Sequence, residues 1–557
     1  MTKPKTTIFF RNILVAGISL WLVIGIVWAI SPTIANPLRA IVQQVGPVAG
    51  PDGRSPDTPY LIDLSGSYKL LPLLTNGDEV PLLIGSFPTF TASLTQTFTM
   101  IGRPDGLGLY PLGDFYYLFV NHELGSSLVT GFSQTEPGQI KGARVSLFVF
   151  DEQWRLVGGK NLIETAVDNG VTYTLNRLTG DYEDDADGVL NNGRNFSVFC
   201  SGSLAQTGFV DGSGDAMPVW FAPQEDGSGD ARGWAVWANG TAVPLPGLGR
   251  YAKEQIVPAS QYRAANAGQT ILLATEDNPD GEIYLYAGAQ TPADPNGFSD
   301  GRLYVLRVSD QLGNPFAYET MKTTDTLTGT WTAVPQDIAL GTAAALSDWV
   351  NADQRSTNFR RPEDMHEDPN HPGTFYFVTT GRSDIPPGSV MPDNAYGKLY
   401  RFTLNPADPT APMPLTFLLE GGPDTGVSYD NITLDSHGQV LIQEDRATIE
   451  ATAVLTNQMR YGRVLTYDPV AQTTRFLFEL NQGVIDPGAA ADYGRWESSG
   501  IIEAGVDART GQSLYLLDVQ AHSLPDPITV EGGQILLAAS PHSGLPYAQY
   551  LPLAQRP

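Results

Sequence analysis

The sequence from Asn358 to Gly381 reads NFRRPEDMHEDPNHPGTFYFVTTG, and its second half shows the unit from which the predicted fold is built. Pro369 to Gly373 is a turn signal, and the apolar run from Thr374 to Val378 has the length of a strand. Similar short runs recur along the chain, and no long helical period follows Tyr60. The other predicted strands are Tyr116 to Val120, Val145 to Phe150, Thr270 to Ala274, Arg302 to Val308, Lys398 to Phe402, Val440 to Gln443, Ser513 to Leu517 and Gln534 to Ala538.

The fold class follows from this recurrence of short strands and turns. The chain has 557 residues, with 58 Gly and 42 Pro spread between the apolar runs, so many turns separate many strands. This pattern predicts an all-β protein, a β-propeller with loop and helical excursions, and a multi-sheet sandwich is the alternative. Insertions are expected near residues 178–194, 211–232 and 310–358.

Acidic residues follow several predicted strands directly. Val120 is followed by Asn121-His122-Glu123, and Gln443 is followed by Glu444-Asp445. In a propeller, the loops on one side meet at the mouth of the central channel, so such acids converge despite their separation in sequence. Ca²⁺ takes about six to eight oxygen ligands, which several loops can supply together. Glu123 is therefore a predicted metal ligand, and the alternative is that these acids are solvated turn residues.

The first half of the opening stretch carries the candidate catalytic group. Pro362 fixes its own φ and disfavours a helical conformation for Arg361. We predict that Arg361 and Glu363 lie in a stiff extended loop. A guanidinium beside carboxylates can hold an oxyanion against a metal ion. A solvated turn with a surface ion pair is the alternative.

Charge and cysteine content restrict the function classes. The formal net charge of −27 disfavours binding to nucleic acid and to anionic membranes. Cys200 is the single cysteine, so no intramolecular disulfide can form. It is either a small buried apolar residue or a thiolate ligand of a transition metal. The sequence contains no HExxH, CxxC, GxSxG or P-loop pattern.

The N-terminal 35 residues have the composition of an export segment. Positive residues precede an apolar run from Ile13 to Ile30, and Thr33-Ile34-Ala35 is a small-residue cleavage site. Residues 1–35 are therefore either a signal peptide or an N-terminal membrane anchor, with the remaining chain outside the cytoplasm. Residues 36–60 are predicted to be a linker, and residues 61–557 the propeller domain.

An ordered series of motifs makes the chain after about residue 60 resemble the PhoX-type alkaline phosphatases and their divergent, uncharacterised relatives. In order, the motifs are Gly102-Arg103-Pro104-Asp105-Gly106-Leu107-Gly108, Asn121-His122-Glu123, Phe199-Cys200-Ser201-Gly202, Leu248-Gly249-Arg250-Tyr251-Ala252-Lys253-Glu254, Thr275-Glu276-Asp277-Asn278-Pro279-Asp280-Gly281, Arg361-Pro362-Glu363-Asp364, Tyr429-Asp430-Asn431-Ile432, Gln443-Glu444-Asp445 and Asp518-Val519-Gln520-Ala521-His522.

The resemblance implies a six-bladed propeller with Fe³⁺ and Ca²⁺ ions that hydrolyses phosphate esters outside the cytoplasm. It implies that Cys200 is a thiolate ligand of iron and that Arg361 holds the substrate phosphate. The implied carboxylate ligands are Glu225, Glu254, Asp277 and Glu363. The sequence departs from the family pattern at Gln224, where the first acid of a Glu-Glu pair is expected, and at Lys253, where many members have His. It also has Phe199 where Asn often precedes the Cys, and it lacks a twin-arginine signal.

These observations leave three functional hypotheses. The first is a metal-dependent phosphomonoesterase in which metal ions act as Lewis acids and Arg361 neutralises developing charge. The second is a calcium-stabilised propeller that acts as a non-catalytic binding module, which the departures at Gln224 and Lys253 favour. The third is a phosphodiesterase or a phytase-like enzyme. Each predicts a small-molecule or protein partner and no nucleic acid.

Overall fold

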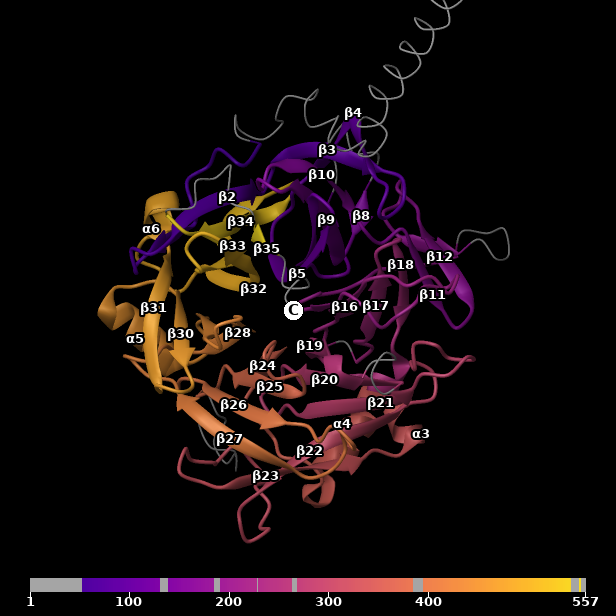
Figure 1. Cartoon of the computed structure of the whole chain (residues 1–557), viewed down its shortest axis with the longest axis vertical. Coiled ribbons are helices and arrows are strands. Elements are labelled where there is room, and N and C mark those ends of the chain that lie inside the picture. Colours follow the sequence, from indigo (N-terminus) through magenta and orange to yellow (C-terminus); the bar gives the residue numbers. More distant parts are fainter. Residues whose placement is uncertain are drawn as a thin grey trace, which may run out of the picture.

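The computed structural model describes residues 53–130, 139–184, 191–227, 229–262, 268–383, 394–541 and 550–551. Strands dominate these residues, which confirms the all-β prediction. The sheets are arranged radially around a central axis (Figure 1). The predicted export segment and most of the predicted linker lie outside the described residues. Among the described residues, no helix has the length and apolar character needed to cross a membrane.

The first two large sheets come from residues 79–244. The first has the order β4-β3-β10-β9-β6-β5. It contains β3 (Glu79–Ile84), β4 (Thr91–Thr99), β5 (Pro104–Leu112), β6 (Phe115–His122), β9 (Arg144–Asp151) and β10 (Leu156–Asn161). The second has the order β14-β13-β12-β11-β18-β17-β16-β15. It contains β11 (Thr165–Asp168), β12 (Val171–Leu175), β13 (Tyr182–Asp184), β14 (Asn191–Arg194), β15 (Ser203–Ala205), β16 (Val219–Pro223), β17 (Gly233–Trp237) and β18 (Thr241–Pro244).

The third sheet has the order β19-β20-β21-β22-β23-β27-β26-β25-β24. It consists of a five-stranded half and a four-stranded half, which pair through their outer strands β23 and β27. Its first half contains β19 (Lys253–Pro258), β20 (Gln269–Glu276), β21 (Ile283–Ala289), β22 (Arg302–Ser309) and β23 (Leu327–Ala333). Its second half contains β24 (Pro362–Glu367), β25 (Thr374–Thr379), β26 (Lys398–Thr403) and β27 (Met413–Glu420).

The last two large sheets each combine C-terminal strands with one strand from the start of the described chain. The order β1-β31-β30-β29-β28 joins β1 (Leu61–Asp63) to β28 (Tyr429–Leu434), β29 (Val440–Glu444), β30 (Arg463–Asp468) and β31 (Thr473–Leu480). The order β2-β34-β33-β32-β35 joins β2 (Lys69–Thr75) to β32 (Glu497–Asp507), β33 (Ser513–Asp526), β34 (Val530–Ala539) and β35 (Tyr550–Leu551). The small β7 (Val129–Thr130) and β8 (Ile140–Lys141) form a separate pair.

Six innermost strands contact one another in a closed ring around the axis. Each packs against the next in the order β5, β15, β19, β24, β28 and β32, and β32 returns to β5. The N-terminal strands β1 and β2 pair at the outer edges of C-terminal sheets, so the two ends of the described chain are joined by strand pairing. Every strand predicted from the sequence lies within an observed strand.

Within the described ranges, helices are confined to connections between strands. They are α3 (Gln336–Ala339), α4 (Ala343–Asn351), α5 (Ile449–Gln458) and α6 (Gln482–Ile485), with short 3₁₀ segments at Pro246–Leu248, Ser260–Tyr262, Ala352–Gln354 and Pro487–Ala489. All three predicted insertions contain regular strands instead, and residues 178–194 hold β13 and β14. The buried strand β16 lies within residues 211–232, and β23 lies within residues 310–358. Their apolar runs are short and flanked by Gly and Asp, which obscured them in the sequence.

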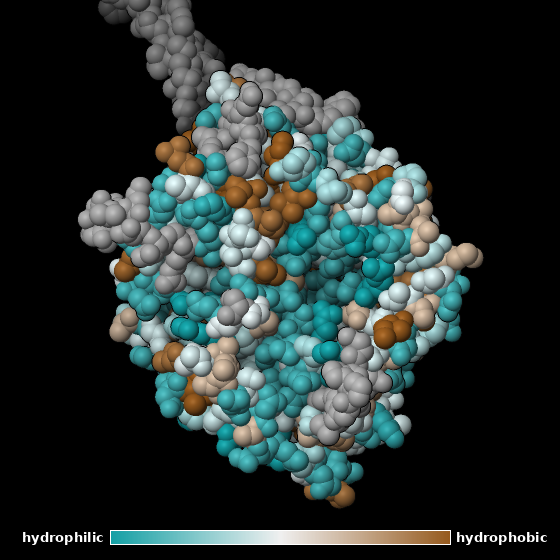
Figure 2. All heavy atoms as spheres, turned by 180° about the vertical axis from the view of Figure 1, so that it is seen from behind, coloured by the Kyte–Doolittle hydropathy of each residue, from teal (hydrophilic) through white to brown (hydrophobic). Residues whose placement is uncertain are grey.

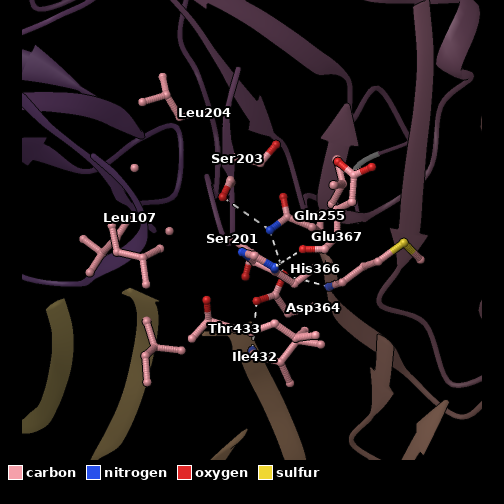
Figure 3. Close-up of a pocket in the computed structure, with 18 of the residues that line it drawn as sticks. Leu107, Ser201, Ser203, Leu204, Gln255, Asp364, His366, Glu367, Ile432 and Thr433 are labelled. Carbon is pink, nitrogen blue, oxygen red and sulfur yellow. Dashed lines mark hydrogen bonds between the residues drawn. The ribbon is translucent and has the colours of Figure 1, made fainter. Parts of the chain in front are cut away.

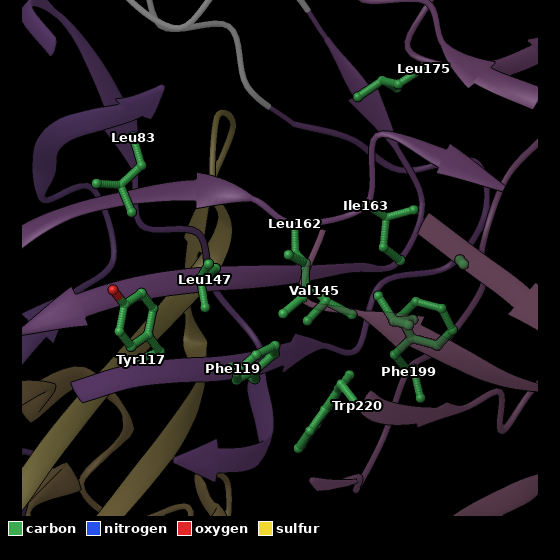
Figure 4. Close-up of a cluster of buried hydrophobic side chains, with 14 of the residues drawn as sticks. Leu83, Tyr117, Phe119, Val145, Leu147, Leu162, Ile163, Leu175, Phe199 and Trp220 are labelled. Carbon is green, nitrogen blue, oxygen red and sulfur yellow. The ribbon is translucent and has the colours of Figure 1, made fainter. Parts of the chain in front are cut away.

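Apolar side chains fill the wedges between neighbouring sheets. Figure 4 shows one wedge, in which Phe119 and Leu147 from the first sheet face Trp220 from the second. Phe119 and Trp220 stack with ring centroids 6.1 Å apart, and both are fully buried. Similar clusters fill the other wedges, so the hydrophobic effect holds the sheets at fixed angles around the axis.

Close packing of the inner strands predicts a sensitive glycine at position 106. A Cβ at Gly106 would lie 2.4 Å from the backbone nitrogen of Gly202 and 2.7 Å from the carbonyl carbon of Ser201. We expect Gly106→Ala to lower the free energy of unfolding in urea by about 1–3 kcal/mol, because β5 and β15 must move apart. Gly212→Ala is the control, since a Cβ there meets no atom within 4 Å. Equal stability of both variants would contradict this packing argument.

Candidate metal centre

Polar residues recur at equivalent places in the sheets. Each innermost strand is antiparallel to the strand that pairs with it. The start of the innermost strand and the end of its partner therefore lie at the same end of the ring. The residues at these two places, strand by strand, are Asp105 and Glu123, Cys200 and Glu225, Glu254 and Asp277, Glu363 and Thr380, and Asp430 and Asp445. In the last sheet, Glu497 at the start of β32 lies opposite Gln520 of β33. Seen from the side opposite to Figure 1, the molecule has a central hollow surrounded mainly by hydrophilic residues (Figure 2).

Three overlapping clusters could each hold a metal ion. Within each cluster the candidate ligand atoms lie within 4.8 Å of one another. The clusters are Asp105-Glu123-Cys200, Cys200-Glu225-Glu254 and Glu254-Glu363-Asp430. Because Cys200 and Glu254 each belong to two clusters, the seven residues form one continuous set of ligands.

The donor chemistry of these clusters fits the metals that the sequence suggested. Two clusters combine the Cys200 sulfur with carboxylates, a donor set that accepts iron. The third contains carboxylates only, which suits a hard cation such as Ca²⁺. Asp105 Oδ1 is buried and has no hydrogen-bond partner among the described residues, so one acceptor of the first cluster is available to a cation.

Five of the metal ligands predicted from the sequence lie in these clusters, namely Glu123, Cys200, Glu225, Glu254 and Glu363. The sequence interpretation did not assign Asp105 or Asp430 as ligands, although both stood in quoted motifs. Asp105 and Asp430 are each the second residue of an innermost strand, as Glu254 and Glu363 are. This shared position could have identified them as ligands.

Burial and mutual repulsion raise the pKa values of the clustered acids. Burial, reinforced by Asp277, raises the pKa of Glu254 to about 8. Burial and the charge of Glu497 raise the pKa of Glu123 to about 7. Burial also raises the pKa of the Cys200 thiol, as do the neighbouring acids. Bound cations would oppose these shifts by favouring the ionised ligands.

The same shifts predict how the stability of the metal-free protein depends on pH. Between about pH 4.5 and pH 8, folded Glu123 and Glu254 still hold protons that the unfolded chain has lost. The free energy of unfolding in EDTA should therefore fall as the pH rises through this range. With saturating Ca²⁺ the fall should be smaller. Urea titrations at a series of pH values test this, and constant or rising stability without metal would contradict it.

Arg361 takes a conformation that the sequence did not predict. Its φ is 55°, in the left-handed region, so the predicted extended conformation is wrong. The backbone is held there because its N–H donates to Asn278 O at 3.1 Å and its carbonyl accepts from Thr380 N at 3.0 Å. Glu363 lies in β24 and not in a loop. Pro362 can open this strand because an innermost strand needs no further backbone partner on its inner side.

The guanidinium of Arg361 is fixed by two acids. Nε donates to Asp277 Oδ1 at 2.8 Å and Nη2 donates to Asp277 Oδ2 at 2.9 Å. Nη2 also lies 3.0 Å from Glu363 Oε1. In the described part of the chain Nη1 has no hydrogen-bond partner, and the Arg361 side chain is 27% exposed to solvent. One donor edge of Arg361 is therefore available to a ligand.

Asp277 differs from the other predicted metal ligands. It belongs to none of the three clusters among the described residues, and both of its oxygens accept from Arg361. Burial would raise the pKa of Asp277, but the charge of Arg361 and its hydrogen bonds lower it. This geometry suits a residue that orients Arg361.

A second charged group borders the clusters. His522 lies 2.6 Å from Glu531 and 3.4 Å from Glu497, and these carboxylates raise its pKa to about 10 against the effect of burial. Gln520 from the same strand donates to Asp105 at 3.2 Å and to Glu123 at 3.1 Å. No motif in the sequence had indicated Glu497, which is the first residue of β32.

Gln224 does not take the place of a metal ligand. Its Oε1 accepts from Trp234 Nε1 at 2.8 Å, and its Nε2 donates to Ser197 O at 3.3 Å. The neighbouring Glu225 is the acid that approaches Cys200 and Glu254. The missing charge at position 224 therefore removes no carboxylate from the three clusters.

A layer of hydrogen bonds closes the site on the side of the central channel. Asn431 donates to Ser201 Oγ at 2.8 Å, and Gln255 donates to Asp364 Oδ1 at 2.7 Å. The other oxygen of Asp364 accepts from the Ile432 N–H at 3.0 Å. Beyond this layer the innermost strands surround a cavity of about 590 Å³, shown in Figure 3. Asp364 thus supports the floor of the site, next to Glu363.

The comparisons with known proteins agree with this geometry. A sequence profile of the family described as Alkaline phosphatase PhoX matches residues 235–483. This match covers less than half of the chain and shows a similarity to the PhoX family. No curated protein sequence matches the chain.

The solved structure of Pseudomonas fluorescens PhoX in complex with vanadate, a transition state analogue, has the same fold. It is 14% identical with a TM-score of 0.57, and the match covers 86% of this chain and 96% of that chain. A Synechocystis apocarotenoid oxygenase mutant is 12% identical with a TM-score of 0.32, over 85% of this chain and 94% of that chain. Trypanosoma rangeli sialidase in complex with sialic acid is 11% identical with a TM-score of 0.31, over 85% of this chain and 59% of that chain. Because both of these TM-scores are below 0.5, the comparison of folds depends on PhoX alone.

The PhoX profile covers only part of the metal centre. Glu254, Asp277, Arg361, Glu363 and Asp430 lie within residues 235–483. Asp105, Glu123, Cys200 and Glu225 lie before them and join the centre only in three dimensions. At the level of the family, the relationship to PhoX indicates a phosphatase-type hydrolase.

Proposed function

We propose that this protein is a metal-dependent phosphate-ester hydrolase that acts on phosphomonoesters. One observation carries the proposal: Arg361 is fixed beside a continuous set of candidate metal ligands and retains a free donor edge. A phosphoryl group needs both kinds of partner, because its oxygens carry negative charge that increases at the transferring group. The relationship to PhoX supports the same reaction class.

The residues have distinct roles in this proposal. Asp277 and Glu363 hold the guanidinium of Arg361 in one orientation, so that Nη1 can donate to a phosphoryl oxygen. Glu254 and its neighbours would hold Ca²⁺ in the all-carboxylate cluster and Fe³⁺ in the two clusters that contain Cys200. Bound metal ions would act as Lewis acids on the phosphoryl oxygens and offset the −27 background charge.

The proposed architecture is a six-bladed propeller. It is supported by the closed ring of innermost strands and by the position of the metal centre at one end of that ring. We also retain the proposal that residues 1–35 are a signal peptide or an N-terminal anchor. Both alternatives put the hydrolase outside the cytoplasm, where its partner would be a small phosphate ester.

Phosphate release by the purified protein tests the function. Residues 36–557 would be assayed with an aryl phosphate monoester and the matching diester, after loading with Ca²⁺ alone or with Ca²⁺ and iron. We expect turnover of the monoester by metal-loaded protein and little turnover in EDTA. Faster turnover of the diester would favour the phosphodiesterase hypothesis. Metal binding without turnover of either ester would favour the calcium-stabilised binding module.

A further inference from the structure

Lys253 occupies a cage of carbonyl groups behind the metal centre. Its side chain is completely buried, and Nζ lies 2.9 Å from Gly249 O and 3.3 Å from the carbonyl oxygens of Tyr251 and Ala231. Nζ also lies 3.7 Å from the centroid of the Tyr251 ring. Three carbonyl acceptors require three N–H donors, which only the protonated amine supplies. The carbonyl oxygens and the aromatic face favour the ammonium form of Lys253, whose pKa burial lowers to about 7.

This cage joins the chain segments that carry three acids of the site. Ala231 belongs to the connection after Glu225, and Lys253 itself precedes Glu254. The Lys253 N–H donates to Gln224 O at 2.8 Å, next to Glu225. The Asp277 N–H donates to Ala252 O at 3.1 Å. Glu276, the residue before Asp277, lies directly opposite Lys253 in the sheet. The buried Lys253 side chain thus ties the connection after β16 to the start of β19, and backbone hydrogen bonds of Ala252 and Lys253 tie the ends of β16 and β20 to the same place.

We infer that Lys253 is a positioning residue of the metal centre, whose buried ammonium group holds the segments of Glu225 and Glu254 together. The inference depends on the proposed assignment of Glu225 and Glu254 as metal ligands. These acids repel one another, so their segments need a cohesive contact that persists before metal ions bind. A fixed ammonium in a carbonyl cage supplies that contact, and it does so without using a ligand atom of the clusters.

The test is chemical rescue of Lys253→Ala, which empties the cage. Isothermal titration with Ca²⁺ should give an affinity lower than that of the parent by about 10- to 100-fold, the range for groups that orient metal ligands. Adding n-propylammonium, which matches the deleted atoms, should restore the affinity in a saturable way. The neutral analogue 1-propanol should not. Lys160→Ala is the control, because this mostly buried lysine lies over Phe90, away from the site.

The outcomes separate this inference from the proposed function. If the parent protein binds no Ca²⁺, the assignment of the metal centre fails. If the parent binds Ca²⁺ and Lys253→Ala binds it equally well, Lys253 is not a positioning residue. Equal rescue by 1-propanol would mean that the lysine only fills space, and would also overturn the inference. Should Lys253→Ala not fold, Lys253→Met keeps the packing without the charge, and an unchanged Ca²⁺ affinity in that variant would overturn it.

Discussion

Arg361→Ala is expected to lower kcat/KM for an aryl phosphate by about 100- to 1,000-fold while the bound metal is retained. This is the usual cost of removing one donor that stabilises charge in the transition state. Arg361 contributes no ligand atom to the three clusters, and its backbone conformation is held by Asn278 O and Thr380 N. Steady-state kinetics and metal analysis of the same preparation provide the measurement.

Two further variants sharpen this test. Arg463→Ala removes another ion-paired arginine, 2.6 Å from Glu479 on outer strands, and should leave kcat/KM unchanged. Asp277→Asn keeps the arginine but weakens the contacts that orient it, so it should lose part of the activity and little metal. If Arg361→Ala hydrolyses the ester as fast as the parent, the role assigned to Arg361 is wrong.

Glu254→Gln should cause a larger loss of metal than the same substitution of any other acid in the three clusters. Glu254 belongs to two of the three clusters, one with Cys200 and one with Asp430. Gln keeps the shape of the side chain but removes its charge, so two cation positions lose a charged ligand at once. We expect metal affinity to fall by more than about 100-fold, the upper limit for groups that only orient ligands.

Glu123→Gln is the matched comparison for Glu254→Gln. Glu123 is equally an acid of the centre but belongs to one cluster only. Elemental analysis should therefore show a smaller loss of metal for Glu123→Gln than for Glu254→Gln, and phosphate release should follow the same order. Equal metal content in the two variants would contradict the assignment of Glu254 to two metal positions.

The elements of the fold could be predicted from sequence because their signals are local. Apolar runs of strand length between Gly- and Pro-containing turns identify strands such as β6, β9 and β20, and the structure confirms them. Strands within the expected insertions, such as β16 and β23, were missed because their flanking turns resemble loops. The conformation of Arg361 was also predicted wrongly. A following proline disfavours the helical region, but distant contacts with Asn278 and Thr380 select the left-handed one.

The sequence by itself determined the residue types of the centre and their positions at the ends of strands, because both are properties of short segments. Only the tertiary structure decided which acids meet. Gln520 and Asp105 are 415 residues apart in sequence, yet Gln520 Nε2 lies 3.2 Å from Asp105 Oδ2. The strands β5 and β32, which carry Asp105 and Glu497 near their starts, are neighbours in the ring. Such proximity depends on closing the ring of inner strands, which apolar wedges between sheets bring about. No local pattern encodes that closure, since it is the sum of packing contacts along the whole chain.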